Sequence, residues 1–458
     1  MYFDKTKKIH FIGIGGIGTS AIAKYFLSLG KTITGSDLYD SDLVKQLRHR
    51  GVKIFNSHQN SNVGPDTDLI IYSPAVPEDN PERLAAAALG LDQFSYPEIL
   101  GELSRKYKTI AVAGTNGKST TTAMLGKIFA AAGADPTVIV GTQVPGFDGN
   151  LRLGQSDILI IEACEWRAHM LNLSPQTIVL TNIAKDHLDF YKDLDDIRYH
   201  FQKFVNLLPL DGFLALNADD ENLTKLISQK GYKVKSWGIL NDQADYLARE
   251  IKTFAGGQSF SVGGDDFILQ VPGKYNVYNA LAALTVAKRF GLDSEVIKKS
   301  LAEFSSTWRR FEIIGPVRGK AETLVVSDYA HHPEALKGVI KAAKEFYPAK
   351  RLVAVFQPHH FDRTAKLFDD FVKSFNDADL VIINEIYDVA GREQDGVRTV
   401  TGQNLAAEIQ KVNPSKEIIY SPNLAETQKR LLKKVKKNDL ILIIGAGDID
   451  EIAREITR

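Results

Sequence analysis

The chain has 458 residues, and its 56 Lys and Arg balance its 56 Asp and Glu, so the formal net charge is zero. This length corresponds to about three domains, and the charge balance argues against a protein that coats nucleic acid or sits on an anionic membrane. The one cysteine, Cys164, excludes an intramolecular disulfide and argues against a Cys-based zinc site. No apolar run approaches the roughly 20 residues of a membrane span, and the N-terminal residues lack a signal-peptide pattern. The sequence therefore predicts a soluble, cytoplasmic, multidomain protein.

The first block alternates short apolar runs with amphipathic segments, which is typical of α/β folds with mostly parallel sheets. Its predicted strands are 9–14, 31–35, 52–55 and 68–72. Its predicted helices are 19–29, 42–50 and a segment after Pro81. The pattern fades through 96–104, and we place a domain boundary at the basic stretch that follows, which gives a first domain of residues 1–107.

The second block, 108–308, repeats the alternation. Its predicted strands are 109–113, 137–140, 157–161 and 177–182, and its predicted helices begin at Lys118 and at Val277. Residues 240–272 alternate apolar residues with glycines and are expected to form antiparallel strands at a sheet edge. The third block, 309–458, has predicted strands at 322–327, 351–356, 379–384 and 439–444. The predicted fold is thus three α/β domains.

A glycine motif follows the first predicted strand. Gly13, Gly15 and Gly18 form G-x-G-x-x-G before a helix, and Asp37 ends the next strand. Glycines let the backbone turn tightly and approach a phosphate at the helix N-terminus, and an acidic residue about 20 positions later can bind a ribose hydroxyl. The pattern favours a nucleotide-like phosphate ligand more firmly than NAD, and a tight turn without a ligand stays an alternative.

The strongest single signal is the loop from Gly114 to Ser119, again between a strand and a helix. Its backbone N–H groups are expected to cradle phosphates, Lys118 to reach the β- and γ-oxygens of ATP, and Ser119 to ligate Mg²⁺. The loop departs from the full phosphate-loop pattern, because Val112 stands where a glycine is usual.

Three further side chains follow strand ends of the same block. Glu162 and Glu165 come after the strand 157–161, and His187 comes after 177–182. Carboxylates at such ends are well placed to hold Mg²⁺. A surface acidic pair and a structural histidine are the alternatives.

Polar clusters mark the remainder of the chain. Asn276 and Asn279 open an Ala-rich helix, where they can pair with adenine or simply cap the helix. Two His-rich segments, 328–333 and 357–364, follow strands of the third block, and Arg309 and Arg310 stand near the linker. Clustered His and Arg suit carboxylate or phosphate recognition, although each is about equally compatible with a surface role.

Taken in order, these motifs resemble the Mur ligase family of peptidoglycan synthesis. The resemblance rests on HFIGIGGIG, ITGSD, AVAGTNGKSTTT, TNIAKDHLDFY, WRRFE, DYAHHPE, FQPHHFDRT and IIGAGDID, which span nearly the whole chain. It implies a Rossmann-like UDP-sugar domain, a central ATPase domain and a C-terminal Rossmann-like domain that binds the amino acid. It also implies ATP-dependent addition of L-alanine to the carboxylate of UDP-N-acetylmuramate through an acyl phosphate, with Mg²⁺, by a monomer or homodimer.

The resemblance carries roles onto particular residues. The catalytic set is Lys118, Glu162 and His187, and the metal set is Ser119, Glu162 and His187. The ATP-binding set is Gly114, Thr115, Asn116, Gly117, Lys118, Ser119, Thr120, Asn276, Arg310, Asp328 and Tyr329. The UDP-sugar set is Gly13, Gly15, Gly16, Gly18, Asp37 and Ser73, and the amino-acid and substrate set is His331, His359, His360 and Arg363.

The chain departs from the family pattern at Asn116, Tyr275, His360 and the segment 164–167, where Cys-Glu-Trp-Arg replaces Asp-Glu-Ser-Asp. These changes leave glycine or L-serine open as acceptors in place of L-alanine. The family's peptide-recycling ligase, which joins a whole tripeptide, is the nearest alternative, and Trp166 mildly favours it. An NAD-dependent oxidoreductase and a catalytically silent nucleotide-binding protein are the alternatives from other classes. The second phosphate loop argues against the first of these, and the retained Lys118 against both.

Overall fold

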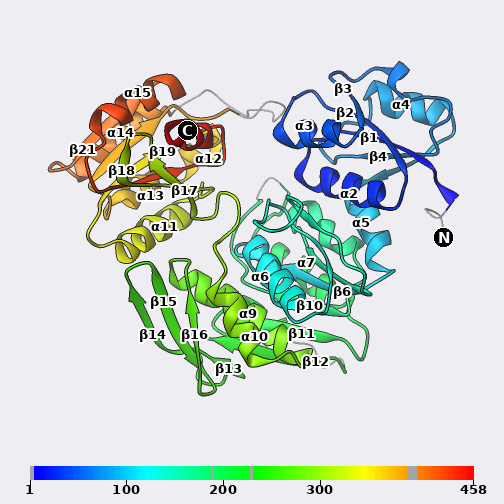
Figure 1. Ribbon diagram of the computed structural model, residues 1–458, viewed down its shortest axis with the longest axis horizontal. Helices are drawn as coiled ribbons and strands as arrows, with labels where there is room; N and C mark the ends of the chain where they lie inside the picture. The colour runs from blue at the N-terminus through cyan, green and yellow to red at the C-terminus, as the bar shows by residue number, and fades with distance from the viewer. Residues whose placement is uncertain (1–4, 188–189, 227–230, 389–399) are drawn as a thin grey trace. The chain divides into compact units, whose positions relative to one another are not determined.

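The structure is a computed structural model that describes residues 5–187, 190–226, 231–388 and 400–458. The chain divides into two compact units (Figure 1). The first unit comprises Met1–Ala248 and Tyr278–Ser300, and the second comprises Arg249–Val277 and Leu301–Arg458. Within the described ranges, no helix is both long and apolar enough to cross a membrane.

The first sheet consists of five parallel strands in the order β3-β2-β1-β4-β5. Its elements are β1 (Lys8–Ile12), α2 (Ile17–Ser28), β2 (Thr32–Ser36), α3 (Asp42–His49), β3 (Lys53–Phe55), η1 (Asn60–Asn62), β4 (Leu69–Tyr72), α4 (Pro81–Ala88), β5 (Asp92–Ser95) and α5 (Tyr96–Ser104). The chain leaves β1 toward β2 on one side and returns at β4 on the other. The carboxyl end of β1 is therefore the switch point at which open parallel sheets bind ligands.

The second sheet has eight strands in the order β13-β12-β11-β10-β6-β9-β7-β8, all parallel except for the β7–β8 pair. Its strands are β6 (Lys108–Ala113), β7 (Thr137–Ile139), β8 (Leu151–Arg152), β9 (Ile158–Glu162), β10 (Thr177–Leu180), β11 (Phe213–Asn217), β12 (Lys233–Gly238) and β13 (Tyr246–Leu247). Its helices are α6 (Lys118–Ala131), η2 (Trp166–Asn172), α7 (Leu194–Val205) and α8 (Glu221–Thr224), and α9 (Lys274–Arg289) and α10 (Ser294–Ala302) follow later in the chain. Because β6 lies between β9 and β10, the segments after these three strands meet at one edge.

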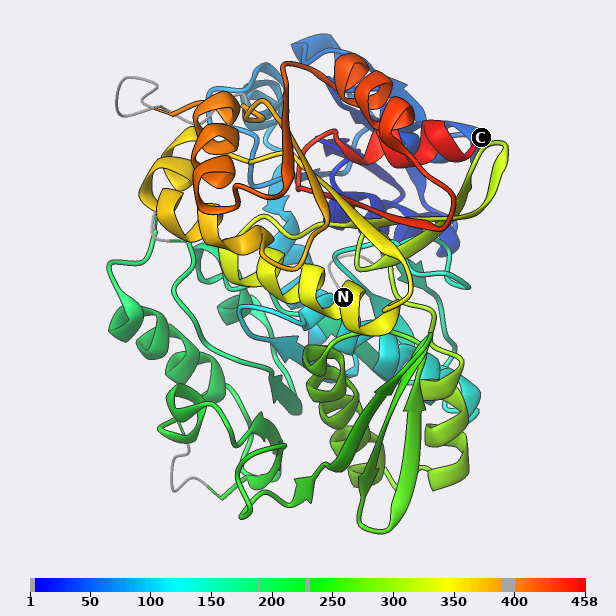
Figure 2. The ribbon, with the colours of Figure 1, turned by 90° about the vertical axis from the view of Figure 1, so that its left-hand side faces the viewer.

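The second unit contains two sheets. The antiparallel strands β14 (Arg249–Phe254), β15 (Gly257–Val262) and β16 (Asp265–Leu269) form a sheet of their own (Figure 2). The other sheet has the order β17-β18-β22-β19-β20-β21, with β17 antiparallel to β18 and the remaining pairs parallel. Its strands are β17 (Glu312–Val317), β18 (Lys320–Asp328), β19 (Arg351–Phe356), β20 (Leu380–Asn384), β21 (Glu417–Ser421) and β22 (Asp439–Ile444).

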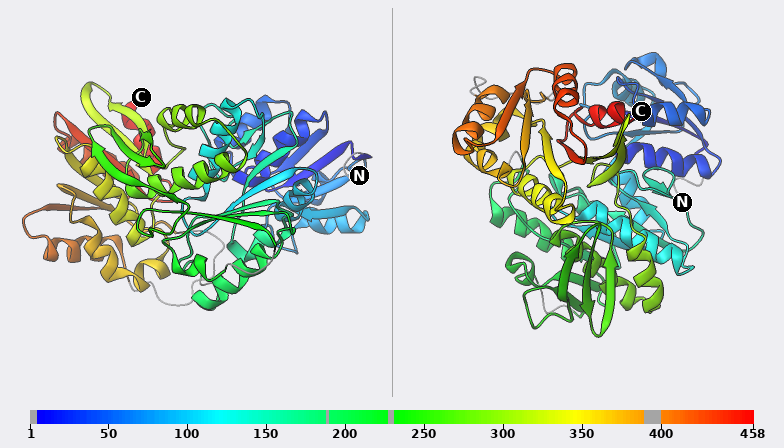
Figure 3. Two further views of the ribbon diagram at one scale, coloured as in Figure 1. Left: turned by 90° about the horizontal axis from the view of Figure 1, so that it is seen from below. Right: turned by 60° about the vertical axis from the view of Figure 1, so that its left-hand side comes forward.

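Helices cover both faces of this six-stranded sheet, as the yellow to red ribbons of Figure 3 show. The apolar residues of α11 (Pro333–Phe346), α13 (Phe368–Val372) and α14 (Gly402–Val412) belong to one core. Those of α15 (Leu424–Lys434) and α16 (Asp450–Thr457) belong to the core on the opposite face. The remaining helices of this part are α12 (Phe361–Lys366) and η3 (Lys373–Phe375).

The predicted fold class is confirmed, since the sheets are mostly parallel and alternate with helices. The antiparallel strands predicted within 240–272 are confirmed by β14–β16. Their predicted place at a sheet edge is wrong, because these strands pair with one another and only β13 joins the large sheet. The segment 96–104, where the pattern fades, is the helix α5, which starts at a capping box of Ser95 and Glu98. The predicted boundaries after 107 and 308 stay predictions.

A buried carboxylate stabilises the first sheet beside its ligand-binding edge. Glu82 is fully buried and accepts hydrogen bonds from Ser36 Oγ (2.5 Å) and Asn62 Nδ2 (2.5 Å). His58 Nδ1 and His10 Nε2 lie 3.3 and 3.6 Å from its Oε2. Burial by itself raises the pKa of Glu82, but the nearby His10 ring and the hydrogen bonds from Ser36 and Asn62 outweigh burial and hold the pKa below its ordinary value.

Replacing Glu82 with glutamine should lower the free energy of unfolding by about 2 kcal/mol at pH 7. Because the folded-state pKa is depressed, this stabilisation is present above the unfolded pKa and is lost as the pH falls through the folded value. Chemical denaturation from pH 7 down to about pH 3 checks this: the difference between wild type and variant should shrink below about pH 4.5. Glu221→Gln, at an exposed carboxylate paired with Lys225, is the control. A difference that stays constant with pH would contradict the prediction.

Candidate active site

The loop between β6 and α6 is built for close approach to a ligand. Gly114 and Gly117 have φ values of +138° and +85°, which L side chains rarely adopt. A Cβ at Gly114 would lie 2.0 Å from Thr181 Oγ1, and one at Gly117 would lie 2.3 Å from Asn279 Oδ1. The loop therefore packs backbone against the segments that follow β10 and against α9. The N–H groups of Thr115 and Asn116 donate to Asn182 O and Oδ1 (2.9 Å each). An anion is expected at the N-terminus of α6, the helix that follows the loop.

Replacing Gly117 with alanine should weaken ATP binding by about tenfold or more, because the added methyl group combines a strained φ with the clash at Asn279. Gly133→Ala is a matched control, since Gly133 also has a positive φ (+76°) but no atom lies within 4 Å of the position that its methyl group would take. Titration calorimetry with an ATP analogue measures both affinities. Equal losses in the two variants would show that backbone strain alone accounts for the effect.

Lys118, the first residue of α6, bends back over this loop. Its Nζ donates to Gly114 O (2.6 Å), Thr115 O (3.1 Å) and Glu165 Oε1 (2.8 Å). Burial lowers the pKa of Lys118, but the carboxylates of Glu165 and Glu162 outweigh burial, and the pKa lies above its ordinary value. The amine is therefore a permanent positive charge at the phosphate loop.

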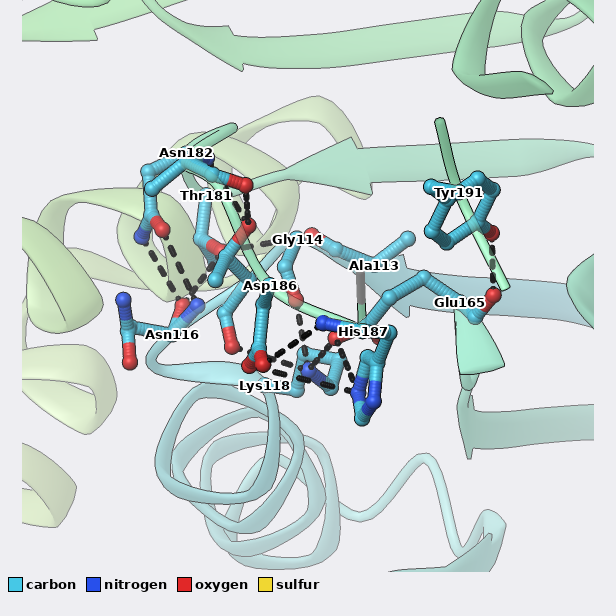
Figure 4. A network of polar contacts seen from close by, with 12 residues as sticks. Ala113, Gly114, Asn116, Lys118, Glu165, Thr181, Asn182, Asp186, His187 and Tyr191 are labelled. Carbon is cyan, nitrogen blue, oxygen red and sulfur yellow. Dashed lines mark hydrogen bonds and ion pairs between the residues drawn. The ribbon is translucent and has the colours of Figure 1, made fainter. Parts of the chain in front are cut away.

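Glu165, Asp186 and His187 form a cluster around this amine (Figure 4). One ligand atom from each lies within 4.8 Å of the others, and His187 Nε2 is 3.8 Å from Glu165 Oε1. The Glu165 side chain is 5% exposed, and its Oε2 has no hydrogen-bond partner among the described residues. Two carboxylates and an imidazole, with one buried carboxylate oxygen unused, are a donor set that fits a hard divalent cation.

The predicted metal ligands are only partly brought together by this cluster. His187 belongs to it, while Glu162 instead accepts the Gly141 N–H (2.8 Å) and Ser119 is buried in the first turn of α6. Glu165 follows the same strand as Glu162, so its position was visible in the sequence. Asp186, next to His187, is the member that sequence reasoning missed, although its adjacency to the histidine was a usable signal.

The glycine turn after β1 assembles the predicted UDP-sugar residues. Gly13 has φ +74°, and a Cβ there would lie 3.0 Å from Ser73 Cβ. The Gly15 N–H donates to Asp37 Oδ2 (2.8 Å), and Gly16 caps α2. A Cβ at Gly18 would lie 2.5 Å from the Tyr96 ring. Neighbouring side chains therefore leave no room for a Cβ at either end of the turn. The turn, Asp37 and Ser73 all lie at the carboxyl edge of the first sheet.

The second unit holds the remaining nucleotide and substrate residues. Asp328 is buried and accepts the N–H groups of Phe311 (2.7 Å) and Ala330 (2.8 Å), and burial raises its pKa. The guanidinium groups of Arg309 and Arg310 lie 5.1 and 4.8 Å from the centre of the Tyr329 ring. A buried acid, an aromatic ring and two arginines therefore lie together at the start of β17 and the end of β18.

Histidines continue this cluster. His331 Nδ1 is 2.9 Å from Tyr329 O, and its ring centre is 6.1 Å from that of His359. His359 stacks on Tyr387 at 5.6 Å and contacts His360 edge-on at 4.7 Å. His360 caps α12, the helix that carries Arg363. The four predicted substrate residues thus come from two strand ends of one sheet.

The two asparagines of α9 fall in different units. Asn276 belongs to the second unit, where its Nδ2 donates to Pro272 O (2.8 Å). Asn279 belongs to the first unit, where its Oδ1 accepts from Thr121 Oγ1 (3.4 Å) beside the phosphate loop. Asn279 was considered with Asn276 in the sequence, and the structure places it against Gly117.

Family models match three successive segments of the chain. The Mur ligase family catalytic domain matches residues 8–108, the Mur ligase middle domain matches 112–287, and the Mur ligase glutamate ligase domain matches 309–447. The chain belongs to the Mur ligase family. The predicted family is therefore confirmed, and an NAD-dependent oxidoreductase is set aside.

Relatives of this Mur ligase align with it from end to end. It is 38% identical to a UDP-N-acetylmuramate–L-alanine ligase of Persephonella marina, over 100% of this chain and 98% of the relative. It is 40% identical to the enzyme of the same name from Caldanaerobacter subterraneus subsp. tengcongensis, over 99% and 97%. Among solved structures, UDP-N-acetylmuramate-alanine ligase of Thermotoga maritima superposes with a TM-score of 0.84 at 29% identity, over 98% of both chains. The murein peptide ligase of Psychrobacter arcticus gives 0.69 at 25%, also over 98% of both chains.

One departure of this Mur ligase from the family pattern faces a cavity. Arg167 lines a cavity of about 290 Å³ together with Tyr72, Arg83, Ser95 and His169. Arg167 has a left-handed φ of +48°, and burial with the nearby Arg167 charge lowers the pKa of His169 to about 4. Since Tyr72 ends β4 next to Ser73, the replaced segment lies on the side predicted to receive the sugar nucleotide.

Proposed function

We propose that this Mur ligase joins L-alanine to the carboxylate of UDP-N-acetylmuramate, with cleavage of ATP to ADP and phosphate, in peptidoglycan precursor synthesis. The observation that carries the proposal is the charged amine of Lys118, held between the phosphate loop and Glu165, in a chain that aligns end to end with L-alanine ligases. A carboxylate is a poor electrophile until it is phosphorylated, and this amine is placed to offset charge as two anions meet.

In the proposed reaction, the muramyl carboxylate attacks the γ-phosphate and gives an acyl phosphate and ADP. The amine of L-alanine then attacks the acyl carbon, the amide forms and phosphate leaves. Lys118 and the backbone at the N-terminus of α6 hold the phosphates. Mg²⁺ would supply further charge neutralisation there, and the residues that would hold it are Ser119, Glu162, Glu165, Asp186 and His187.

The division of labour that we propose follows three segments. Residues 1–107 bind the UDP-sugar through the turn 13–18, Asp37 and Ser73. Residues 108–308 bind ATP, with Asn276 at adenine. Residues 309–458 supply Arg310, Asp328 and Tyr329 to the nucleotide, and they supply the remaining side chains to the substrates: His331, His359, His360 and Arg363. We further propose that the protein acts in the cytoplasm, where ATP is available, as a monomer or homodimer.

The test is phosphate release from ATP with Mg²⁺ and UDP-N-acetylmuramate, in the presence of L-alanine, glycine, L-serine or the recycled tripeptide. We expect release and coupled product that require both the sugar nucleotide and L-alanine. Preference for the tripeptide would instead identify the recycling ligase, which Trp166 mildly favours. ATP binding without turnover for any acceptor would overturn the proposal.

A further inference from the structure

A loop between β7 and β8 touches both ligand-binding edges of the first unit. The loop, residues 140–150, is closed by its own backbone: Val140 N donates to Asn150 O (3.1 Å), and Val144 N donates to Gly149 O (2.8 Å). Val140, Val144 and Asn150 are buried. Backbone hydrogen bonds and buried side chains thus anchor the loop where it joins the central sheet.

Its far end is bonded to the helix that follows the glycine turn. Asn150 is fully buried, and its Nδ2 donates to Ile17 O and to Ser20 Oγ (3.0 Å), both in the first turn of α2. Asn150 Oδ1 accepts from Lys24 Nζ (2.9 Å), one helical turn further along α2. One amide side chain therefore holds the start of the helix whose N-terminus faces the predicted UDP site.

Lys24 completes this attachment from the helix side. It is 2% exposed, and its Nζ also donates to Asp148 O (2.9 Å), while Arg50 bonds Asp148 Oδ1 (2.5 Å). Burial lowers the pKa of Lys24, and the Asp148 carboxylate opposes that shift. Gly149 has φ +66°, and a Cβ there would lie 3.0 Å from Lys24 Nζ, so the loop is shaped around the amine. A buried ammonium is costly unless it is fully bonded, so this fit restricts the position of the loop.

The near end of the loop reaches the ATP side. Gly141, next to Val140, donates its N–H to Glu162 Oε2 (2.8 Å), and a Cβ at Gly141 would lie 2.8 Å from that oxygen. Asn150 therefore contacts α2 through its side chain and Val140 through its backbone. A displacement of α2 would be transmitted to the carboxylate at the end of β9 through three successive hydrogen-bonded contacts: α2 to Asn150, Asn150 to Val140, and Gly141 to Glu162.

We propose that the 140–150 loop couples binding of the sugar nucleotide at the glycine turn to the ATP centre, with Asn150 and Lys24 as positioning residues. This inference rests on the proposed function of the two edges. It predicts reciprocal coupling. The factor by which the sugar nucleotide changes the affinity for ATP must equal the factor by which ATP changes the affinity for the sugar nucleotide.

The experiment measures the affinity of the full chain for a non-hydrolysable ATP analogue with Mg²⁺, with and without UDP-N-acetylmuramate, by calorimetry. In the wild type we expect the sugar nucleotide to change this affinity by about fivefold or more. In Asn150→Asp, which keeps the size and the acceptor for Lys24 but loses the donor to Ile17 and Ser20, the change should fall to about twofold or less. Lys24→Met should reduce the change to the same extent. The double variant should show little further reduction, because Lys24 and Asn150 are joined by one hydrogen bond.

Lys45→Met, at an exposed lysine of α3 in the same sheet domain, is the matched control and should keep the wild-type effect. Thermal unfolding of every variant separates loss of coupling from loss of folding. A wild type without coupling, or an Asn150→Asp variant that keeps it while folded, would overturn the inference. Because turnover of the wild type is tested separately by phosphate release, the inference and the proposed function can fail independently.

Discussion

Replacing Lys118 with methionine is expected to lower kcat by about 10³-fold, in the range seen when one preorganised charge donor is removed from a transition state. Methionine keeps the length of the side chain but loses the charge that lies 2.8 Å from Glu165 and over the carbonyls of the phosphate loop. The measurement is steady-state phosphate release at saturating UDP-N-acetylmuramate and L-alanine.

The control for this variant is Lys127→Met, which removes a lysine from the same helix outside the loop. It should change kcat by less than about threefold, as expected for a substitution away from the site. Binding of an ATP analogue separates the two contributions of Lys118, since a charge used mainly in the transition state lowers kcat more than it weakens binding. Full activity in Lys118→Met would contradict the proposed reaction.

Replacing Glu165 with glutamine is expected to lower kcat by about 10²-fold and to raise the Mg²⁺ concentration needed for half activity by about tenfold or more. The amide keeps the shape of the side chain but removes the charge that holds Lys118 and leaves a weaker donor at the unpartnered buried position. Activity measured over a Mg²⁺ titration gives both numbers.

Glu162→Gln in the same titration ranks the two carboxylates. Glu162 was predicted as a metal ligand from its place after the predicted strand 157–161, whereas the structure groups Glu165 with Asp186 and His187. A larger rise in the Mg²⁺ requirement for Glu165→Gln would follow from the cluster. If Glu165→Gln leaves the Mg²⁺ concentration for half activity unchanged and Glu162→Gln raises it, the metal ligands are instead those predicted from the sequence alone.

The strand–turn–helix motifs were predictable because the chemistry and the backbone geometry demand the same residues. Gly114 and Gly117 are required by positive φ angles and by close packing, and the same glycines mark a phosphate loop in the sequence. The same holds for Gly13, Gly15 and Asp37, whose spacing predicts one turn, in which the Gly15 N–H donates to Asp37 Oδ2. Where the backbone geometry and the ligand-binding role require the same residues, a single sequence is enough to predict the motif.

The parts of the site and fold that the sequence did not predict depend mostly on contacts between distant segments. Glu165 and Asp186 are 21 positions apart, and only the neighbouring positions of β9, β6 and β10 bring them to Lys118. The pairing of β14–β16 into a separate sheet could not be predicted from alternation, because an antiparallel strand has the same pattern at an edge and in a sheet of its own. Helix α5 was missed although Ser95 and Glu98 form a capping box, since its nine residues were interpreted as the fading end of the first block.

The division of the chain has a practical consequence for dissecting the protein. The polypeptide passes between the two units after residues 248, 277 and 300, so neither unit is one continuous stretch. After a single protease cut at any of these points, the other two connections still join the two units. Fragments 1–300 and 301–458 would each contain only part of the second unit. In the intact protein, Gly256 N of the first fragment donates to Phe346 O of the second. Restored folding on mixing such fragments would therefore report their association, which makes the connection after residue 300 a natural place for a split-protein complementation assay.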